Sequence, residues 1–254
     1  MRKTLLMGGL VAATLGLAAL EASAQLAISI GIRETEAGGG PTGVPIGGNG
    51  GSAGGIEFVN LDGQTLNLDG TFQTFTFNFQ NDALTAFAGA TANGAYDGTR
   101  GVLEMIRIRN TGGVTQPIQL FIDNIVNTTA AGPQTVSNFE GFADGTEVTF
   151  QEPRFSGSTS AHLMTTPNTS LTSSASASQG TVSDEINFQF VDATNTRWIR
   201  LTTFNTPNLP NPVIDFANNS SLTFQIRGVI VPEPASAAVF GLGASVLMLV
   251  RRRK

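Results

Sequence analysis

The stretch FQTFTFNF, residues 72–79, places phenylalanine at alternate positions, Phe75, Phe77 and Phe79, with threonine or asparagine between them. Successive side chains of a β-strand point to opposite faces, so this spacing predicts a strand with one apolar and one polar face. Residues 26–34, LAISIGIRE, alternate in the same way. The apolar residues of that second stretch are Leu26, Ile28, Ile30 and Ile32. Strands with one buried and one solvated face are typical of antiparallel sheets.

Further stretches of the chain also have the composition of strands. They are residues 102–110, 118–126, 186–192, 196–204 and 221–231. In the first of them the polar residues Glu104, Arg107 and Arg109 alternate with apolar ones, and the pattern slips by one residue near Met105. Helical periodicity is limited to one turn at residues 82–87. Asp-Gly pairs predict turns between the strands. They are residues 62–63, 69–70, 97–98 and 144–145. We therefore expect an all-β protein, an antiparallel β-sandwich of jelly-roll type, over residues 25–231.

The distribution of charge excludes one class of function. Away from the two terminal segments the chain carries eight bases, all of them arginine, against 17 acids. Nucleic-acid binding needs a basic surface that neutralises phosphates, so we expect no nucleic-acid partner. The chain has no cysteine, which excludes disulfides and thiolate metal sites.

Residues 1–24 have the features of a signal peptide. Two bases are followed by an apolar run over residues 5–20, and Ala22 and Ala24 take the −3 and −1 positions of a cleavage site before Gln25. Small residues at these positions are typical of signal-peptidase substrates. We expect export across the inner membrane and cleavage before Gln25. The alternative is a signal anchor that is not cleaved.

Residues 232–254 have the opposite arrangement of charge. Pro232 and Pro234 exclude a helix through this point, and residues 235–250 then form an uncharged apolar run. As a helix this run is roughly 24 Å long, a little under the ~30 Å hydrocarbon core of a membrane. Bases follow it directly: Arg251, Arg252, Arg253 and Lys254. The positive-inside rule predicts a transmembrane helix with its basic end in the cytoplasm and the preceding domain outside. The alternative is a buried core helix.

The order of Val231-Pro232-Glu233-Pro234, an apolar helix and a basic end resembles the PEP-CTERM sorting tail. The resemblance covers only residues 232–254, and Pro232, Glu233 and Pro234 match the recognition motif. It implies a Gram-negative envelope protein whose tail is read by a membrane-embedded exosortase. The chain would be a single-pass membrane precursor, cleaved at or near the motif and passed to the cell surface or an extracellular polysaccharide matrix. It resembles the cargo of that enzyme, not the enzyme itself.

The exported region resembles carbohydrate-binding jelly rolls in pattern, with the two halves in permuted order. Residues 72–79, 102–110 and 116–125 resemble the closing half, and residues 139–150, 196–201 and 221–228 the opening half. We expect one domain over residues 25–231, with two small sandwiches divided near residues 130–134 as the alternative. The resemblance also implies a structural calcium ion where the first and last strands meet, with Asp123 and Glu140 as ligands. The alternative is a capped turn and an edge aspartate without metal.

The sequence contains little that indicates catalysis. His162 is the single histidine, and no G-x-S-x-G nucleophile motif is present. Glycoside hydrolysis needs a pair of carboxylates, but no pair stands out among the 17 acids. One tryptophan, Trp198, and one tyrosine offer few platforms for sugar rings. We expect a non-enzymatic exported surface or matrix protein with polysaccharide as a partner and no cofactor beyond the calcium. A lectin-like carbohydrate-binding module is the first alternative, and a secreted glycoside hydrolase the second.

Overall fold

The computed structural model describes residues 24–34, 55–89, 92–96, 98–217 and 219–232. These residues form β-strands joined by loops, with one short 3-10 helix, η1 (Ser160–His162). The strands are β1 (Gln25–Arg33), β2 (Ile56–Asn67), β3 (Asp69–Asn78), β4 (Leu84–Ala88), β5 (Arg100–Asn110), β6 (Ile118–Thr129), β7 (Gly132–Ser137), β8 (Thr169–Ser173), β9 (Ser183–Phe188), β10 (Trp198–Thr202), β11 (Val213–Asp215) and β12 (Ser221–Ile230).

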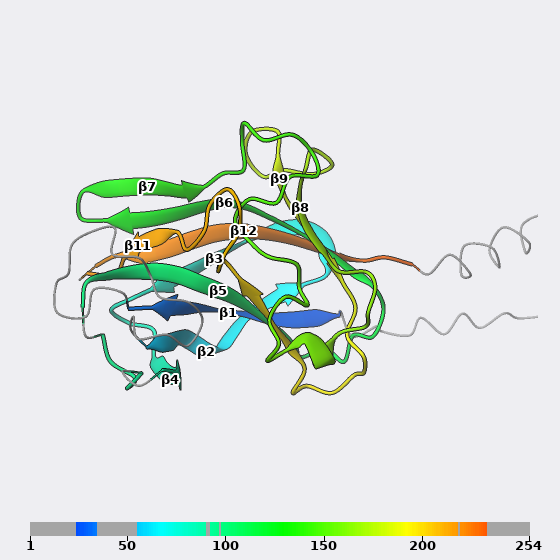
Figure 1. The fold of residues 1–254 in the computed structure, drawn as a ribbon, viewed down its shortest axis with the longest axis horizontal. Coiled ribbons are helices and arrows are strands. Elements are labelled where there is room, and N and C mark those ends of the chain that lie inside the picture. Colours follow the sequence, from blue (N-terminus) through cyan, green and yellow to red (C-terminus); the bar gives the residue numbers. More distant parts are fainter. Residues whose placement is uncertain (1–23, 35–54, 90–91, 97, 218, 233–254) are drawn as a thin grey trace, which may run out of the picture.

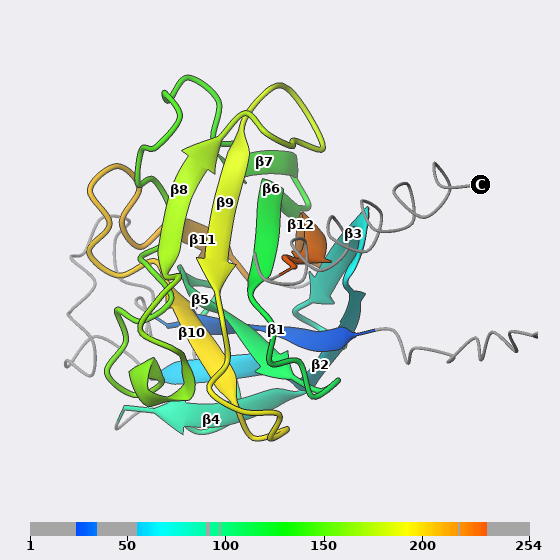
Figure 2. The ribbon, with the colours of Figure 1, turned by 90° about the vertical axis from the view of Figure 1, so that its right-hand side faces the viewer.

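The strands form two antiparallel sheets that pack face to face (Figures 1 and 2). Sheet A has the order β10-β5-β1-β2-β4, and sheet B has the order β3-β12-β6-β9-β8. Two further strands extend these sheets, since β11 also pairs with β5 and β7 also pairs with β6. Every strand pair in both sheets is antiparallel. The prediction of an antiparallel β-sandwich is confirmed.

The alternating apolar residues of the sequence form the core between the sheets. Leu26, Ile28, Ile30 and Ile32 of β1 are fully buried, and so are Phe75, Phe77 and Phe79 in and after β3, at 2% exposure or less. Each such side chain contributes roughly 1.5–3 kcal/mol on burial. The phenylalanine face of residues 72–79 therefore lines the sheet B side of the core, as predicted.

One long strand in each sheet, β5 in sheet A and β6 in sheet B, contains a β-bulge. Two short strands pair with the same edge of that long strand, one on either side of the bulge. In sheet A, β10 and β11 pair with opposite ends of β5, and the extra residue Glu104 lies between them. In sheet B, β9 and β7 pair with opposite ends of β6, and Asp123 and Asn124 lie between them. Asn124 has a φ of 53°, the left-handed conformation that asparagine tolerates. The predicted slip near Met105 is thus a bulge, and each bulge buries a carboxylate, Glu104 or Asp123, at 0% exposure.

Three local expectations differ from the structure. The Asp62-Gly63 pair does not join two strands but lies inside β2, where the pairing with β1 shifts register and Gly63 has a φ of 84°. Residues 84–88 form strand β4 and not a helical turn. Residues 139–150, which resemble part of the opening half of a carbohydrate-binding jelly roll, contain no strand, although Phe139, Val148 and Phe150 still enter the core.

Residues 130–131 form the turn of the β6–β7 hairpin, at the place where a domain boundary was the alternative. Strands from before and after this turn lie side by side in both sheets, as β5 with β10 in sheet A and β3 with β12 in sheet B.

The predicted signal helix and the predicted transmembrane helix, residues 235–250, lie outside the described residues. Within the part of the chain that the structure describes, no helix is long and apolar enough to cross a membrane.

Candidate functional site

The two ends of the described fold emerge beside one loop, residues 111–117. Gln25, the first residue of β1, accepts a hydrogen bond at its carbonyl oxygen from the Gly112 N–H at 2.8 Å. Val231, just after β12, donates its N–H to the Pro117 carbonyl oxygen at 2.8 Å. Figure 1 shows the start of β1 and the end of β12 at the same end of the sandwich, which we call the proximal end. Val231 and Pro232 are exposed there. The other predicted signal residues, Ala22, Glu233, Pro234 and the four terminal bases, lie outside the described residues.

A pocket of about 650 Å³ lies at the opposite, distal end. Phe79, which lines it, donates its N–H to the carbonyl oxygen of Ser220 at 3.2 Å. Ser220 directly precedes β12, and β12 then runs ten residues to the proximal end. At about 3.3 Å per residue the pocket is roughly 30 Å from Val231. We call it the distal pocket. The residues that line it include Phe79, Gln80, Asp82, Tyr96, Thr99 and Phe216.

Three aromatic rings form the floor of the distal pocket. Tyr96 and Phe216 stack with ring centroids 5.1 Å apart, and Phe79 meets both rings edge-on, at 6.3 and 6.1 Å. Phe79 and Phe216 also belong to the core, so the floor is anchored to both sheets. Offset and edge-on ring pairs of this kind add roughly 0.5–1.5 kcal/mol each beyond their buried area.

The hydroxyl oxygen of Tyr96 is buried and has no hydrogen-bond partner among the described residues. Burial raises the pKa of Tyr96 above its ordinary value, and the charges of Asp82, Glu34 and Glu57 raise it further. The phenol is therefore neutral, in a negative local field. Glu57 also shapes the pocket wall, because its buried carboxylate accepts the N–H of Asn93 at 2.7 Å and the N–H of Gly94 at 3.2 Å.

The two residues predicted as calcium ligands each hold part of the β8–β9 loop. The Oδ2 atom of Asp123 accepts the N–H of Ser178 at 2.8 Å and that of Gln179 at 2.9 Å. The Oε1 atom of Glu140 accepts the N–H of Thr181 at 2.7 Å and that of Val182 at 2.9 Å, and these bonds lower the pKa of Glu140. The two carboxylates therefore act on neighbouring residues of one loop.

This arrangement does not fit a calcium ion. Ca²⁺ takes six to eight oxygen ligands, whereas backbone N–H groups point at both carboxylates here. No group of three or more acidic or histidine side chains that could hold a metal occurs in the described ranges. Gly180 lies between the residues that the two carboxylates hold, with a φ of 63°, and an added Cβ there would collide with the Glu140 carboxylate. The two acids instead position the turn at residues 178–182.

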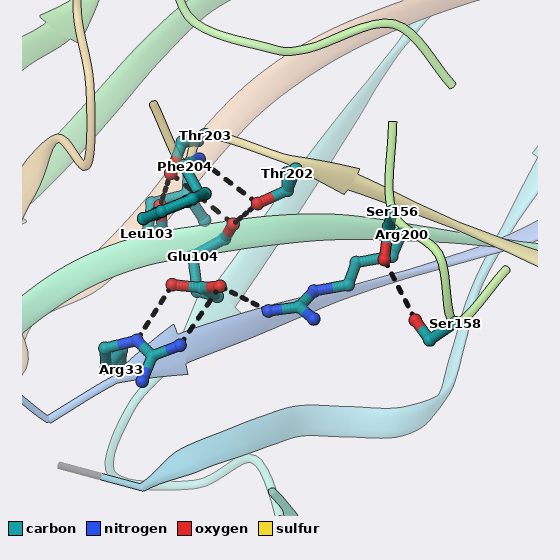
Figure 3. Close-up of polar contacts among 9 residues, drawn as sticks. All are labelled: Arg33, Leu103, Glu104, Ser156, Ser158, Arg200, Thr202, Thr203 and Phe204. Atoms are coloured by element: carbon teal, nitrogen blue, oxygen red, sulfur yellow. Dashed lines mark hydrogen bonds and ion pairs between the residues drawn. The ribbon is translucent and has the colours of Figure 1, made fainter. Parts of the chain in front are cut away.

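The bulged Glu104 forms a buried ionic cluster with Arg33 of β1 and Arg200 of β10 (Figure 3). The Nε atom of Arg33 lies 3.0 Å from Glu104 Oε2, and Arg200 donates to Oε1 of the same carboxylate. All three side chains are at most 5% exposed. The alternation of β5 correctly predicted that Glu104 points away from the core between the sheets. That outer face of the sheet is covered at this point, so Glu104 is buried and not solvated. Breaking one partner of such a buried cluster is costly, so it holds three strands together.

Threonine hydroxyls donate hydrogen bonds to backbone carbonyl oxygens at the same bulge. Thr203 Oγ1 donates to the Leu103 carbonyl oxygen at 2.6 Å, and Thr202 Oγ1 donates to that of Glu104 at 3.2 Å (Figure 3). The Thr203 hydroxyl thus satisfies the Leu103 carbonyl oxygen in the gap between β10 and β11, whereas the Glu104 carbonyl oxygen also accepts the backbone N–H of Thr203 at 3.0 Å.

The contacts of Trp198 and His162 indicate that both side chains have a structural role. Trp198 packs edge-on against Phe58 and Phe87, with ring centroids 6.0 and 5.9 Å apart, and Arg107 lies over its ring at 5.2 Å. The Nδ1 atom of His162 donates a hydrogen bond to the carbonyl oxygen of Trp198 at 2.9 Å. His162 therefore covers the open edge of β10, which would otherwise present unpaired backbone groups.

Two hollows of about 490 and 290 Å³ lie beside β8 and share Glu152, Asn168 and Thr169. Glu147 lines the smaller hollow, and its pKa is raised by burial and by Glu152. Behind them, burial raises the pKa of Asp184 to about 8, against the opposing effect of a Ser170 hydrogen bond. Asp184 lines neither hollow, so its protonated carboxyl does not reach a molecule bound there.

Searches against known protein families, curated proteins and solved structures returned no match. The distal pocket was missed by sequence reasoning. Asp82, Tyr96 and Phe216 come from three separate loops, and no spacing in the sequence indicates that they meet.

Proposed function

We propose that this chain is an exported, non-catalytic protein of a Gram-negative envelope, delivered by its C-terminal tail to the cell surface or the extracellular polysaccharide matrix. One observation supports this proposal above the others. The strands begin at Gln25 and end at Ile230. These are the positions at which the predicted signal peptide and sorting tail join the rest of the chain. The sandwich therefore needs neither signal to complete its sheets.

The same geometry supports the roles assigned to the two signals. Signal peptidase would cut after Ala24, directly before β1. The exosortase would read Pro232, Glu233 and Pro234, with residues 235–250 in the membrane and the bases from Arg251 to Lys254 on the cytoplasmic side. Val231 and Pro232 are exposed, and the last strand ends before them, so an enzyme has access to the start of the motif.

A polysaccharide partner, and a jelly-roll topology for the sandwich, belong to the same proposal. The lectin-like alternative is supported by the distal pocket, because it combines aromatic rings with polar side chains. For the hydrolase alternative, the smaller hollow beside β8 offers one pair of acids, Glu147 and Glu152, and the pKa of Glu147 is raised. No calcium enters the proposal, since the carboxylates of Asp123 and Glu140 are occupied by N–H donors.

Cell fractionation tests the sorting proposal. The full chain is expressed in a Gram-negative host that has an exosortase, beside a variant with Pro232→Ala, Glu233→Ala and Pro234→Ala. We expect the unchanged chain at the surface or in the medium and the variant retained in the inner membrane. A variant with Val231→Ala alone serves as the control for local changes. An identical distribution of the unchanged chain and the triple variant would contradict the proposal.

A further inference from the structure

We propose that the distal pocket binds a neutral sugar residue of an extracellular polysaccharide. This inference rests on the proposed function, because it names the site and the ligand class through which an exported protein would contact the matrix. The shape, the polar groups, the charge and the position of the pocket support it.

The size and the floor of the pocket suit a sugar ring. A volume of about 650 Å³ is within the usual range of small-molecule sites and accommodates one or two sugar residues. Its floor is the rigid set of Phe79, Tyr96 and Phe216. Phe79 and Phe216 are only 2% and 4% exposed, so the half-buried Tyr96 presents the ring surface of this floor. A pyranose has one face made of C–H groups, which would pack against that ring while the hydroxyls remain at the rim.

The rim supplies the short polar side chains that sugar hydroxyls require. Gln80 has an amide that both donates and accepts, Thr99 has a hydroxyl, and both residues are exposed. Asp82 adds a carboxylate whose Oδ2 atom accepts the N–H of Asn78 at 2.7 Å. A carboxylate accepts about four hydrogen bonds, so this fixed side chain keeps capacity for a ligand.

The charge of the pocket selects against acidic sugars. Asp82 is the one charged side chain among the described residues that line it, and no arginine or lysine lines it there. Glu34 and Glu57 lie close enough to add to the field on Tyr96. Uronates, sulfates and phosphates are bound through arginine or lysine, so this pocket repels them.

The position of the pocket fits a polymer ligand. It lies one full length of β12 from Val231, at the end of the sandwich opposite Val231 and Pro232, the last described residues. While the tail is in the membrane, the pocket faces away from the lipid surface, toward the matrix.

The experiment measures binding of the purified full chain, kept in detergent, to an array of neutral and acidic oligosaccharides that covers the common terminal residues. We expect binding to at least one neutral group and none to uronic-acid or sulfated glycans. The double variant Gln80→Ala, Thr99→Ala, at two exposed positions, should weaken that binding about tenfold or more, because each substitution removes a hydrogen bond to the sugar. Thr74→Ala, an exposed threonine of β3 outside the pocket, is the control and should leave binding unchanged.

Absence of binding to every neutral glycan, a preference for acidic glycans, or full binding by the double variant would each overturn the inference. Its failure is distinguishable from failure of the proposed function. A chain that is released to the cell exterior but binds no neutral glycan loses the pocket assignment only. A chain that binds a neutral glycan but keeps its tail in the membrane loses the sorting proposal only.

Discussion

The protonation of Asp184 makes the stability of the sandwich depend on pH. This carboxyl is 2% exposed, on the core face of β9, and its Oδ2 atom accepts the Ser170 hydroxyl at 2.9 Å. Burial raises its pKa from the model-compound value of 3.8 to about 8, and the charges of Glu147 and Glu185 add to the rise. The folded protein therefore binds a proton at Asp184 that the unfolded chain has released at neutral pH.

The sign and size of the effect follow from this difference. Because the folded pKa lies above the unfolded value, the contribution to stability is complete below pH 4 and is lost as the pH rises toward 8. Each pH unit in that window costs about 1.4 kcal/mol, so the whole window corresponds to roughly 6 kcal/mol. Asp184→Asn removes the titration while keeping an oxygen that accepts the Ser170 hydroxyl. Relative to the unchanged protein, the variant should gain stability steadily from pH 5 to pH 8.

Urea unfolding, followed by the fluorescence of Trp198, measures the free energy of unfolding of both proteins at pH 5, 6, 7 and 8. The difference between them cancels the titration of groups that do not interact with Asp184. Ser170→Ala is the matched control, because it removes the hydroxyl but leaves the carboxyl buried, and its slope with pH should resemble that of the unchanged protein. Parallel profiles of Asp184→Asn and the unchanged protein over this range would refute the reasoning.

Three further results are expected. Glu104→Gln should lower the free energy of unfolding by about 3–5 kcal/mol in urea titrations, since it leaves two buried arginines without their shared charge, and a loss under 1 kcal/mol would contradict the ionic role. Gly180→Ala should lower the melting temperature clearly, because Gly180 has a positive φ and an added Cβ would collide with Glu140. Gly157→Ala is the control and should not lower it, since an added Cβ there meets no atom within 4 Å. Equal effects of the two substitutions would count against the role of Glu140 in positioning the loop. Excess chelator should leave the melting temperature unchanged, and a fall reversed by added Ca²⁺ would restore the calcium interpretation of Asp123.

The sequence predicted the core faces well and the covering loops poorly. Alternation identified the buried residues of β1 and β3, because burial against a second sheet repeats at the strand period. The strand β2 escaped notice, since it follows a glycine-rich segment and has an Asp-Gly pair at its own bulge. The polar face of β5 was identified, but not its burial, because Arg33 and Arg200 come from strands distant in sequence.

The candidate sites show the same limit. Asp123 and Glu140 were predicted as calcium ligands, and in the structure both carboxylates accept backbone N–H groups of the β8–β9 loop. Sequence spacing cannot tell an acid that meets a metal from an acid that meets backbone N–H groups. The distal pocket depends on loop positions that only the assembled sandwich defines.

The mass of the mature C-terminus tests the central proposal most directly. The chain is expressed in a Gram-negative host with an exosortase, and the form outside the cell is isolated and measured by mass spectrometry. The proposal predicts a product that begins at Gln25 and ends near Val231–Pro234, immediately after the last strand. A chain that still ends at Lys254 and stays in the membrane would contradict it.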